Sequence, residues 1–201
     1  MKKYAVPGLR ALLVLLSPLG AILACQLVSL QHWEAAWQWL LDSPGPAGAY
    51  YLALLLAQLT LTGLTRLSGL AGLLAALPPF ALTLVSYYKS AINGEPLTLA
   101  DLGLAAHLGD ITRFAAENIV ITPAVWGAIA LLAALLIALT ALDILSLLGR
   151  DPLRLSLGRG LALAGAGGVL TGLFLVLFLR PYCVDQYKAY GEYLDDFVQR
   201  I

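Results

Sequence analysis

The residues best suited to chemistry in this chain lie together in one polar stretch. Lys89, Glu95 and Asp101 bring one positive and two negative side chains close along the sequence. Gly94 follows an asparagine, a pair that signals a turn, and Pro96 biases the backbone of Glu95 toward an extended conformation. This spacing predicts a turn that presents charges to a neighbouring group, such as a lipid headgroup at a membrane surface.

The same stretch continues into a predicted helix. Thr98 and Asp101 have the three-residue spacing of a helix start, where a hydroxyl can accept from an early amide and an acid stabilises the positive helix end. Leu102 and Phe114 would then face an apolar phase. Segment 89–121 is therefore predicted as an amphipathic segment, either with ordinary solvated charges or as a platform that positions headgroups.

Histidine and cysteine, which bind metals and act in catalysis, are sparse. The two histidines, His32 and His107, fall on separate predicted loops, and the two cysteines, Cys25 and Cys183, lie far apart. A metal site needs several clustered ligands, and a disulfide framework needs more cysteines. We therefore expect no metal site and no complete catalytic site in these residues.

Two polar residues stand inside apolar runs. Ionisable groups at membrane depth are expensive and often mark functional sites. Asp143 lies near the end of its run, so its carboxylate is either functional or simply wetted at the interface. Gln58 is one of the few polar residues at the centre of a run, and this scarcity disfavours a small transporter or channel.

The composition indicates the environment of these residues. Hydrophobic residues make up 60% of the 201-residue chain and charged residues 12%, whereas a typical soluble domain has about a quarter charged residues. The 12 basic and 12 acidic residues cancel, and no basic stripe points to nucleic acid. The chain is predicted to be an all-α, polytopic membrane helix bundle with short amphipathic helices on its outer face.

Five apolar stretches are long enough to cross a bilayer, which takes about 20 residues each. We predict membrane helices at about 11–30, 47–64, 67–88, 123–142 and 161–179, so that the transmembrane domain is 1–179 and a juxtamembrane tail follows at 180–201. Pro18 should kink the first helix, and Pro78-Pro79 should break the third. Neighbouring helices or water must satisfy the freed carbonyls, so we expect the third helix inside the bundle.

Basic and aromatic residues predict the orientation, because cytoplasmic segments carry an excess of Lys and Arg. If the helices alternate, seven basic residues fall on one side: Lys2, Lys3, Arg10, Arg66, Arg150, Arg154 and Arg159. The tryptophans fall on the other side, at the headgroup level that indole rings prefer: Trp33, Trp37, Trp39 and Trp126. The N-terminus is predicted in the cytoplasm and the C-terminus outside. A short helix between the first two spans would place Trp33 and Trp37 on one face.

A stripe of small residues repeats at four-residue spacing in the fifth predicted helix, at Gly160, Ala164, Gly168 and Gly172. Small residues on one face let two helix backbones approach closely. We expect this stripe to pack against another helix of the chain. Self-association or a membrane-protein partner is the alternative.

The stretch after the third helix resembles a known family. Lys89, then Gly94-Glu95-Pro96-Leu97, then Asp101-Leu102 is similar to the membrane region of lipoteichoic acid synthases and related phosphoglycerol transferases. The resemblance implies five transmembrane helices in a bacterial cell membrane with the N-terminus inside, followed by an extracellular sulfatase-like catalytic domain of the alkaline phosphatase superfamily. It implies transfer of phosphoglycerol from phosphatidylglycerol. In this resemblance the motif residues have a structural or headgroup-facing role: Lys89, Gly94, Glu95, Pro96 and Asp101.

The family's catalytic machinery has no counterpart that we can place in this sequence. The resemblance implies a threonine nucleophile and a divalent metal, manganese or magnesium, in the catalytic domain, and neither motif is found here. We therefore expect these residues to anchor and orient a catalytic domain that they do not contain. The alternatives are a stand-alone membrane adaptor or assembly protein and, less favoured, a small transporter.

The start of the chain carries a rival signal. Lys2-Lys3, a leucine-rich run and Ile22-Leu23-Ala24-Cys25 together resemble a bacterial lipoprotein signal, in which the cysteine is lipidated and the preceding peptide is removed. The apolar run continues beyond Cys25 to Leu30, which favours a cysteine that is simply buried in the first helix.

Overall fold

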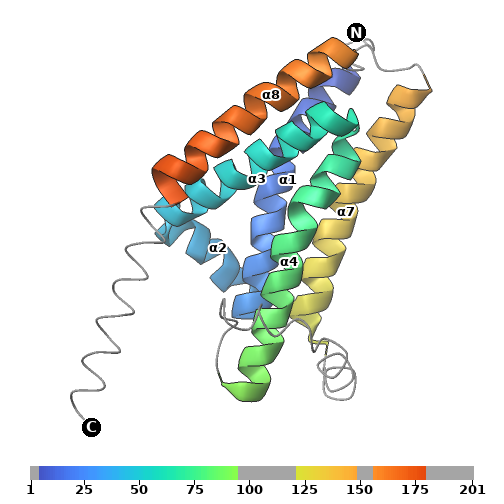
Figure 1. The fold of residues 1–201 in the computed structure, drawn as a ribbon. Helices are drawn as coiled ribbons and strands as arrows, with labels where there is room; N and C mark the ends of the chain where they lie inside the picture. Colours follow the sequence, from blue (N-terminus) through green and yellow to red (C-terminus); the bar gives the residue numbers. More distant parts are fainter. Residues whose placement is uncertain (1–4, 95–120, 149–155, 180–201) are drawn as a thin grey trace, which may run out of the picture.

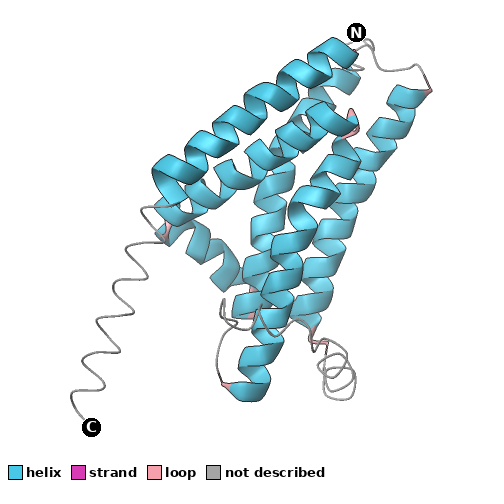
Figure 2. Ribbon diagram, viewed as in Figure 1, coloured by secondary structure: helices cyan, strands magenta, loops and turns pink. Residues whose placement is uncertain are grey.

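The computed structural model describes residues 5–94, 121–148 and 156–179, which form helices joined by turns (Figures 1 and 2). The helices are α1 (Ala5–Leu30), α2 (Trp33–Asp42), α3 (Pro44–Thr65), α4 (Ser68–Asn93), α7 (Pro123–Leu147) and α8 (Leu157–Phe174). A wider π-helical turn, η3 (Leu175–Leu179), continues α8. The predicted all-α fold is confirmed.

Five of these helices, α1, α3, α4, α7 and α8, are long and apolar enough to cross a membrane. Large apolar side chains also cover much of their outer surface, among them Leu12, Leu77, Ile137, Val169 and Leu170. Soluble proteins rarely expose contiguous apolar surface of this kind, whereas lipid solvates it without penalty. The fold therefore defines the class of the protein, a polytopic membrane protein with a helical bundle.

The observed helices extend beyond the predicted apolar stretches. α1 begins at Ala5, α4 continues to Asn93, and α7 continues to Leu147. α3 begins at Pro44. Proline is tolerated in the first turn because the N–H groups there have no acceptor within the helix, so the missing N–H of proline breaks no helical hydrogen bond. Hydropathy locates the part of a helix that matches the hydrocarbon thickness, whereas backbone hydrogen bonding carries the helix on into the interface.

Successive membrane helices run in opposite directions, so their termini lie toward two ends of the bundle (Figure 1). We call one the basic end, where α1 and α8 begin, α7 ends and Arg66 joins α3 to α4. The other is the aromatic end, where α4 ends and α7 begins near Trp126. α2 joins α1 to α3 at the aromatic end.

The core lies among α1, α4 and α7, with α2 closing its aromatic end. Its buried members are mostly small or branched: Ala21, Ala24, Leu27, Val28, Ala36, Ala76, Phe80, Val125, Ala128 and Leu132. α4 contacts α1, α3 and α7 with one face, whereas Leu74, Leu77 and Pro78 are exposed on the other. The helix continues through Pro78-Pro79, so the predicted break is wrong. α8 packs mainly on α3, at one side of the molecule.

The short helix α2 is the predicted helix between the first two spans. Two of its three tryptophans, Trp33 and Trp37, are exposed and meet edge to face, with ring centroids 6.1 Å apart and an interplanar angle of 85°. Gln31, with φ of 62°, provides the left-handed turn from α1 into α2. Ala36 turns inward to the core. One face of α2 thus contacts protein while the other is available to headgroups.

Candidate functional site

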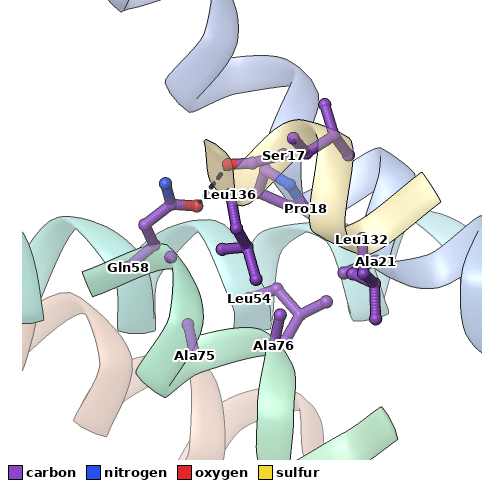
Figure 3. A pocket seen from close by; sticks show the side chains of 11 residues that line it. Ser17, Pro18, Ala21, Leu54, Gln58, Ala75, Ala76, Leu132 and Leu136 are labelled. Carbon is purple, nitrogen blue, oxygen red and sulfur yellow. Dashed lines mark hydrogen bonds between the residues drawn. The ribbon is translucent and has the colours of Figure 1, made fainter. Parts of the chain in front are cut away.

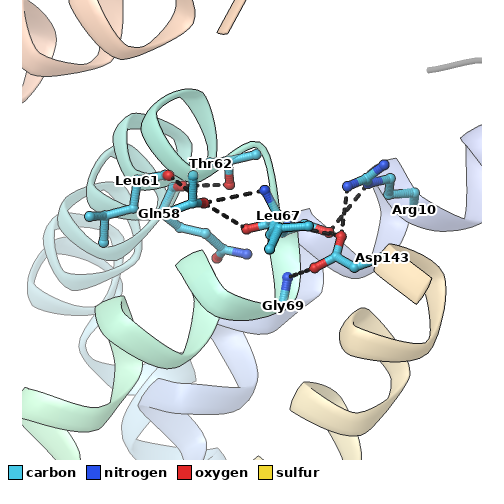
Figure 4. A network of polar contacts seen from close by, with 9 residues as sticks. Arg10, Gln58, Leu61, Thr62, Leu67, Gly69 and Asp143 are labelled. Carbon is cyan, nitrogen blue, oxygen red and sulfur yellow. Dashed lines mark hydrogen bonds and ion pairs between the residues drawn. The ribbon is translucent and has the colours of Figure 1, made fainter. Parts of the chain in front are cut away.

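The basic end holds a buried polar cluster centred on Asp143 (Figure 4). Asp143 lies on α7, and its side chain is only 6% exposed. Its Oδ1 accepts from Nη2 of Arg10 on α1 at 2.7 Å, and from the Ser68 hydroxyl and backbone amide at 2.8 and 3.0 Å. Its Oδ2 accepts from the Gly69 amide at 2.6 Å. We call Arg10, Ser68, Gly69 and Asp143 the carboxylate clasp.

The clasp solves a problem created by the start of α4. The first amides of a helix have no partner within the helix, and a polar N-cap side chain normally satisfies one of them. The N-cap of α4 is Leu67, which has no acceptor in its side chain. Asp143 supplies that acceptor from another helix, and its negative charge is favoured at the positive helix end.

Arg10 compensates the charge of this carboxylate. Its Nε also donates to the Ser68 hydroxyl at 3.2 Å, so the guanidinium contacts both partners. A buried ion pair is stable only when hydrogen bonds satisfy the groups that have left water. Here both carboxylate oxygens have donors, so Asp143 is neither isolated nor merely wetted at the interface. The prediction of a simply solvated Asp143 is wrong.

The α3–α4 turn beside the clasp is held by local contacts. Arg66 adopts a left-handed conformation with φ of 61°. The Thr65 hydroxyl lies 2.8 Å from the Leu61 carbonyl, and its oxygen accepts from the Leu67 amide at 3.2 Å. These contacts fix the turn, so that Ser68 and Gly69 are presented to Asp143.

A second polar layer lies deeper, where Gln58 of α3 meets Ser17 of α1 (Figure 3). Gln58 is 2% exposed and Ser17 is 7% exposed. The Ser17 Oγ lies 2.8 Å from Oε1 of Gln58. A cavity of about 10 Å³ adjoins this pair, lined also by Pro18, Gly72, Ala75 and Leu136. It is too small for any solute larger than water, which gives no support to a transport pathway here.

The end of α4 locates the start of the predicted motif. Lys89 is half-buried on the last turns of α4, next to the edge-to-face pair Tyr87 and Tyr88. Gly94 ends the helix in the left-handed conformation, with φ of 77°, and its amide donates to the Ser90 carbonyl at 2.9 Å. This is the glycine C-cap that relieves strain at such a position. Glu95, Pro96 and Asp101 lie outside the described residues, as does most of segment 89–121 and all of the tail 180–201.

The small-residue stripe of α8 needs a correction. Gly160 and Ala164 do pack against α3, where a Cβ added to Gly63 would lie 2.6 Å from the Gly160 carbonyl and would clash with the Ala164 amide. Gly168 and Gly172 are exposed, with no atom within 4 Å of an added Cβ. Gly167 takes the next contact instead.

Helix geometry explains this difference. Four residues advance an α-helix about 40° past a full turn, so a strict four-residue repeat drifts off the contact face. The buried positions of α8 are Gly160, Ala164, Gly167 and Phe174, which are separated by four, three and seven residues and so stay on one side of the helix. Gly168 and Gly172 therefore do not pack within the described chain.

The cysteine and histidine of the described residues do not form a reactive site. Cys25 is partly buried in α1 and packs against the core cluster. His32 is exposed at the start of α2. Across ranges 5–94, 121–148 and 156–179, no group of three or more His, Cys, Asp or Glu residues could hold a metal ion.

Comparison of the chain with known protein families, with curated proteins and with solved structures finds no match in any of the three. The fold thus places the chain in the class of multi-pass membrane proteins with about five spans.

Proposed function

We propose that this chain is the membrane region of a lipoteichoic acid synthase-like phosphoglycerol transferase, which anchors and orients an extracellular catalytic domain. One observation carries the proposal. α4 ends at Gly94 at the aromatic end of the bundle, directly before Glu95-Pro96. In the sequence, Gly94-Glu95-Pro96-Leu97 thus comes directly after a membrane helix that ends at the aromatic end, which supports the position that the resemblance implies.

The proposed orientation places the basic end in the cytoplasm of a bacterium and the aromatic end outside. Arg66 and Arg159 are both exposed at the basic end, beside the half-buried Arg10. An excess of Lys and Arg marks cytoplasmic segments, so this grouping supports an inside N-terminus. The tail 180–201 would then emerge outside.

Lys89 is the residue that we propose to face a headgroup. It lies one turn before the Gly94 cap, on the helix that also carries Tyr87 and Tyr88. A lysine on an apolar stem can lie along the helix and direct its ammonium to the phosphate level. Phosphatidylglycerol carries one negative charge, which such a cation attracts. The divalent metal of the proposed reaction would belong to the catalytic domain and not to these residues.

The test uses the product of the natural reading frame, followed past the codon for Ile201 if the frame continues. The purified protein would be reconstituted in vesicles of phosphatidylglycerol with manganese, and release of diacylglycerol would be measured. We expect metal-dependent release. Lys89→Ala should lower the rate, whereas Arg159→Ala, which removes a cation at the opposite end, should not. A folded protein that releases no diacylglycerol with manganese or magnesium would contradict the proposal.

A second candidate function, a stand-alone membrane adaptor or assembly protein, is favoured by one feature of α8. The helix buries one face on α3, while Gly165, Gly168 and Gly172 leave a small-residue face exposed. Small residues allow close helix contact in lipid. Crosslinking through Gly168→Cys in cell membranes distinguishes the candidates, because an adaptor should yield a specific crosslinked partner and an anchor that acts alone should not.

A further inference from the structure

The Gln58 amide has one atom without a hydrogen-bond partner among the described residues. Gln58 is 2% exposed, its Oε1 lies 2.8 Å from Ser17 Oγ, and its Nε2 has no partner. A buried polar atom without a partner is rare, because its desolvation is uncompensated. The Gln58 amide should therefore have a further hydrogen-bond partner that is not a protein atom.

Rotating the amide does not remove the problem. The Ser17 hydroxyl has one hydrogen, and the Val14 carbonyl lies 3.1 Å away as a second acceptor. Pro18 has no N–H to donate to the Val14 carbonyl, so the Ser17 hydroxyl is the donor that satisfies this carbonyl. With the amide turned by 180°, Nε2 would donate to Ser17 and Oε1 would be left without a partner. Either orientation leaves one Gln58 atom unsatisfied.

The facing helix α4 has a carbonyl that lacks its usual helical donors. Pro78 and Pro79 occupy the third and fourth positions after Ala75 on α4. These are the positions whose amides would donate to the Ala75 carbonyl in 3₁₀ or α geometry, and proline has no N–H. Ala75 lines the same cavity as Gln58. The side chains of Gln58 and Ala75, from α3 and α4, thus line one small cavity (Figure 3).

We infer that this cavity is a binding site for one water molecule, which bridges the Gln58 amide of α3 to the Ala75 carbonyl of α4. The cavity volume of about 10 Å³ matches the least space that holds one water, about 10–15 Å³. Water fits either amide orientation, because it can accept from Nε2 and donate to the carbonyl, or donate to Oε1 and to the carbonyl. The two helices with internal prolines, α1 and α4, are then joined through Gln58, by Ser17 on one side and by water on the other.

Solid-state NMR of the full chain in lipid bilayers tests this inference directly. With ¹⁵N-labelled glutamine and alanine, magnetisation from water protons should reach the Gln58 side-chain amide, assigned by its loss in Gln58→Leu. The exposed Gln38 side chain is the positive control, and the backbone amide of Ala24, a residue with 0% exposure, is the dry control. Transfer to Gln38 without transfer to Gln58 would overturn the inference.

A variant pair at Gly72 provides a second measurement. An added Cβ there would lie 3.5 Å from Gln58 Nε2 and 3.3 Å from Leu139 Cδ1. Gly72→Ser places a hydroxyl where the water is inferred, so the water transfer should disappear while thermal stability is kept. Gly72→Ala adds the same Cβ without the hydroxyl and should unfold several degrees below Gly72→Ser. Equal melting temperatures for the two variants would contradict the need for a hydrogen-bonding group at this site.

Discussion

Asp143 on α7 caps the first turn of α4 at Ser68, although 75 residues separate the two in sequence. The same carboxylate accepts from Arg10 of α1 at 2.7 Å. Three membrane helices therefore meet at one carboxylate, at the basic end of the bundle. In a bilayer, where apolar contact gives no hydrophobic gain between helices, such a polar contact contributes to which helices pair.

Removing this carboxylate should strongly destabilise the bundle. Asp143→Leu removes the carboxylate that compensates the charge of Arg10 and frees the amides of Ser68 and Gly69, so we expect a loss of about 3–5 kcal/mol in the free energy of unfolding. Ile144→Ala, at a 53% exposed neighbour, is the control and should have little effect. Unfolding by denaturant in mixed micelles measures both. An equal effect of the two variants would contradict the clasp.

A double variant separates the ion pair from the cap. Exchange of a buried ion pair for apolar residues is often neutral. Arg10→Met with Asp143→Leu should therefore recover much of the loss, but the uncapped amides of Ser68 and Gly69 should keep a deficit of about 1 kcal/mol. Complete recovery would mean that Asp143 acts only as the partner of Arg10.

The contact between α3 and α8 should depend on Gly63 and Gly160 and not on Gly168. A side chain at Gly63 would meet the backbone of α8 at under 3 Å, whereas one at Gly168 meets nothing within 4 Å. Gly63→Leu should separate the helices and lower stability by about 1–3 kcal/mol or more. Gly168→Leu should leave the stability unchanged. A disulfide formed between Thr60→Cys and Gly167→Cys reports whether the helices remain together, because these two positions are in contact in the native bundle.

The end of α4 should be sensitive to the conformation of Gly94. Its φ of 77° is strained for any side chain, even though the space around it is open. Gly94→Ala should destabilise the protein by about 1–2 kcal/mol. Gly48→Ala, which also has open space but lies inside helix α3, should be neutral or stabilising. Thermal unfolding compares the melting temperatures of the two variants. A melting temperature of Gly94→Ala equal to or above that of Gly48→Ala would contradict the C-cap.

The sequence reveals the membrane helices because a bilayer requires long apolar runs, and this requirement is local. It does not reveal the clasp, since Arg10 and Asp143 are 133 residues apart and each can also be explained as an interfacial charge. One signal was present, because Leu67 stands where α4 needs a polar cap. The four-residue repeat wrongly predicts that Gly168 packs against another helix of the chain, because an α-helix has 3.6 residues per turn and the repeat drifts off the contact face.

The orientation of the bundle tests the account most directly, because the proposed anchor requires the aromatic end outside. Gly45 at the start of α3 and Gly158 at the start of α8 both have open space around them, at the aromatic and basic ends respectively. Each would be changed to cysteine after Cys25 and Cys183 are replaced by serine, and intact bacterial cells would be treated with a membrane-impermeant maleimide. We predict that Gly45→Cys is labelled in intact cells and Gly158→Cys only after permeabilisation. Labelling of Gly158→Cys alone in intact cells would place the motif end in the cytoplasm and contradict the account.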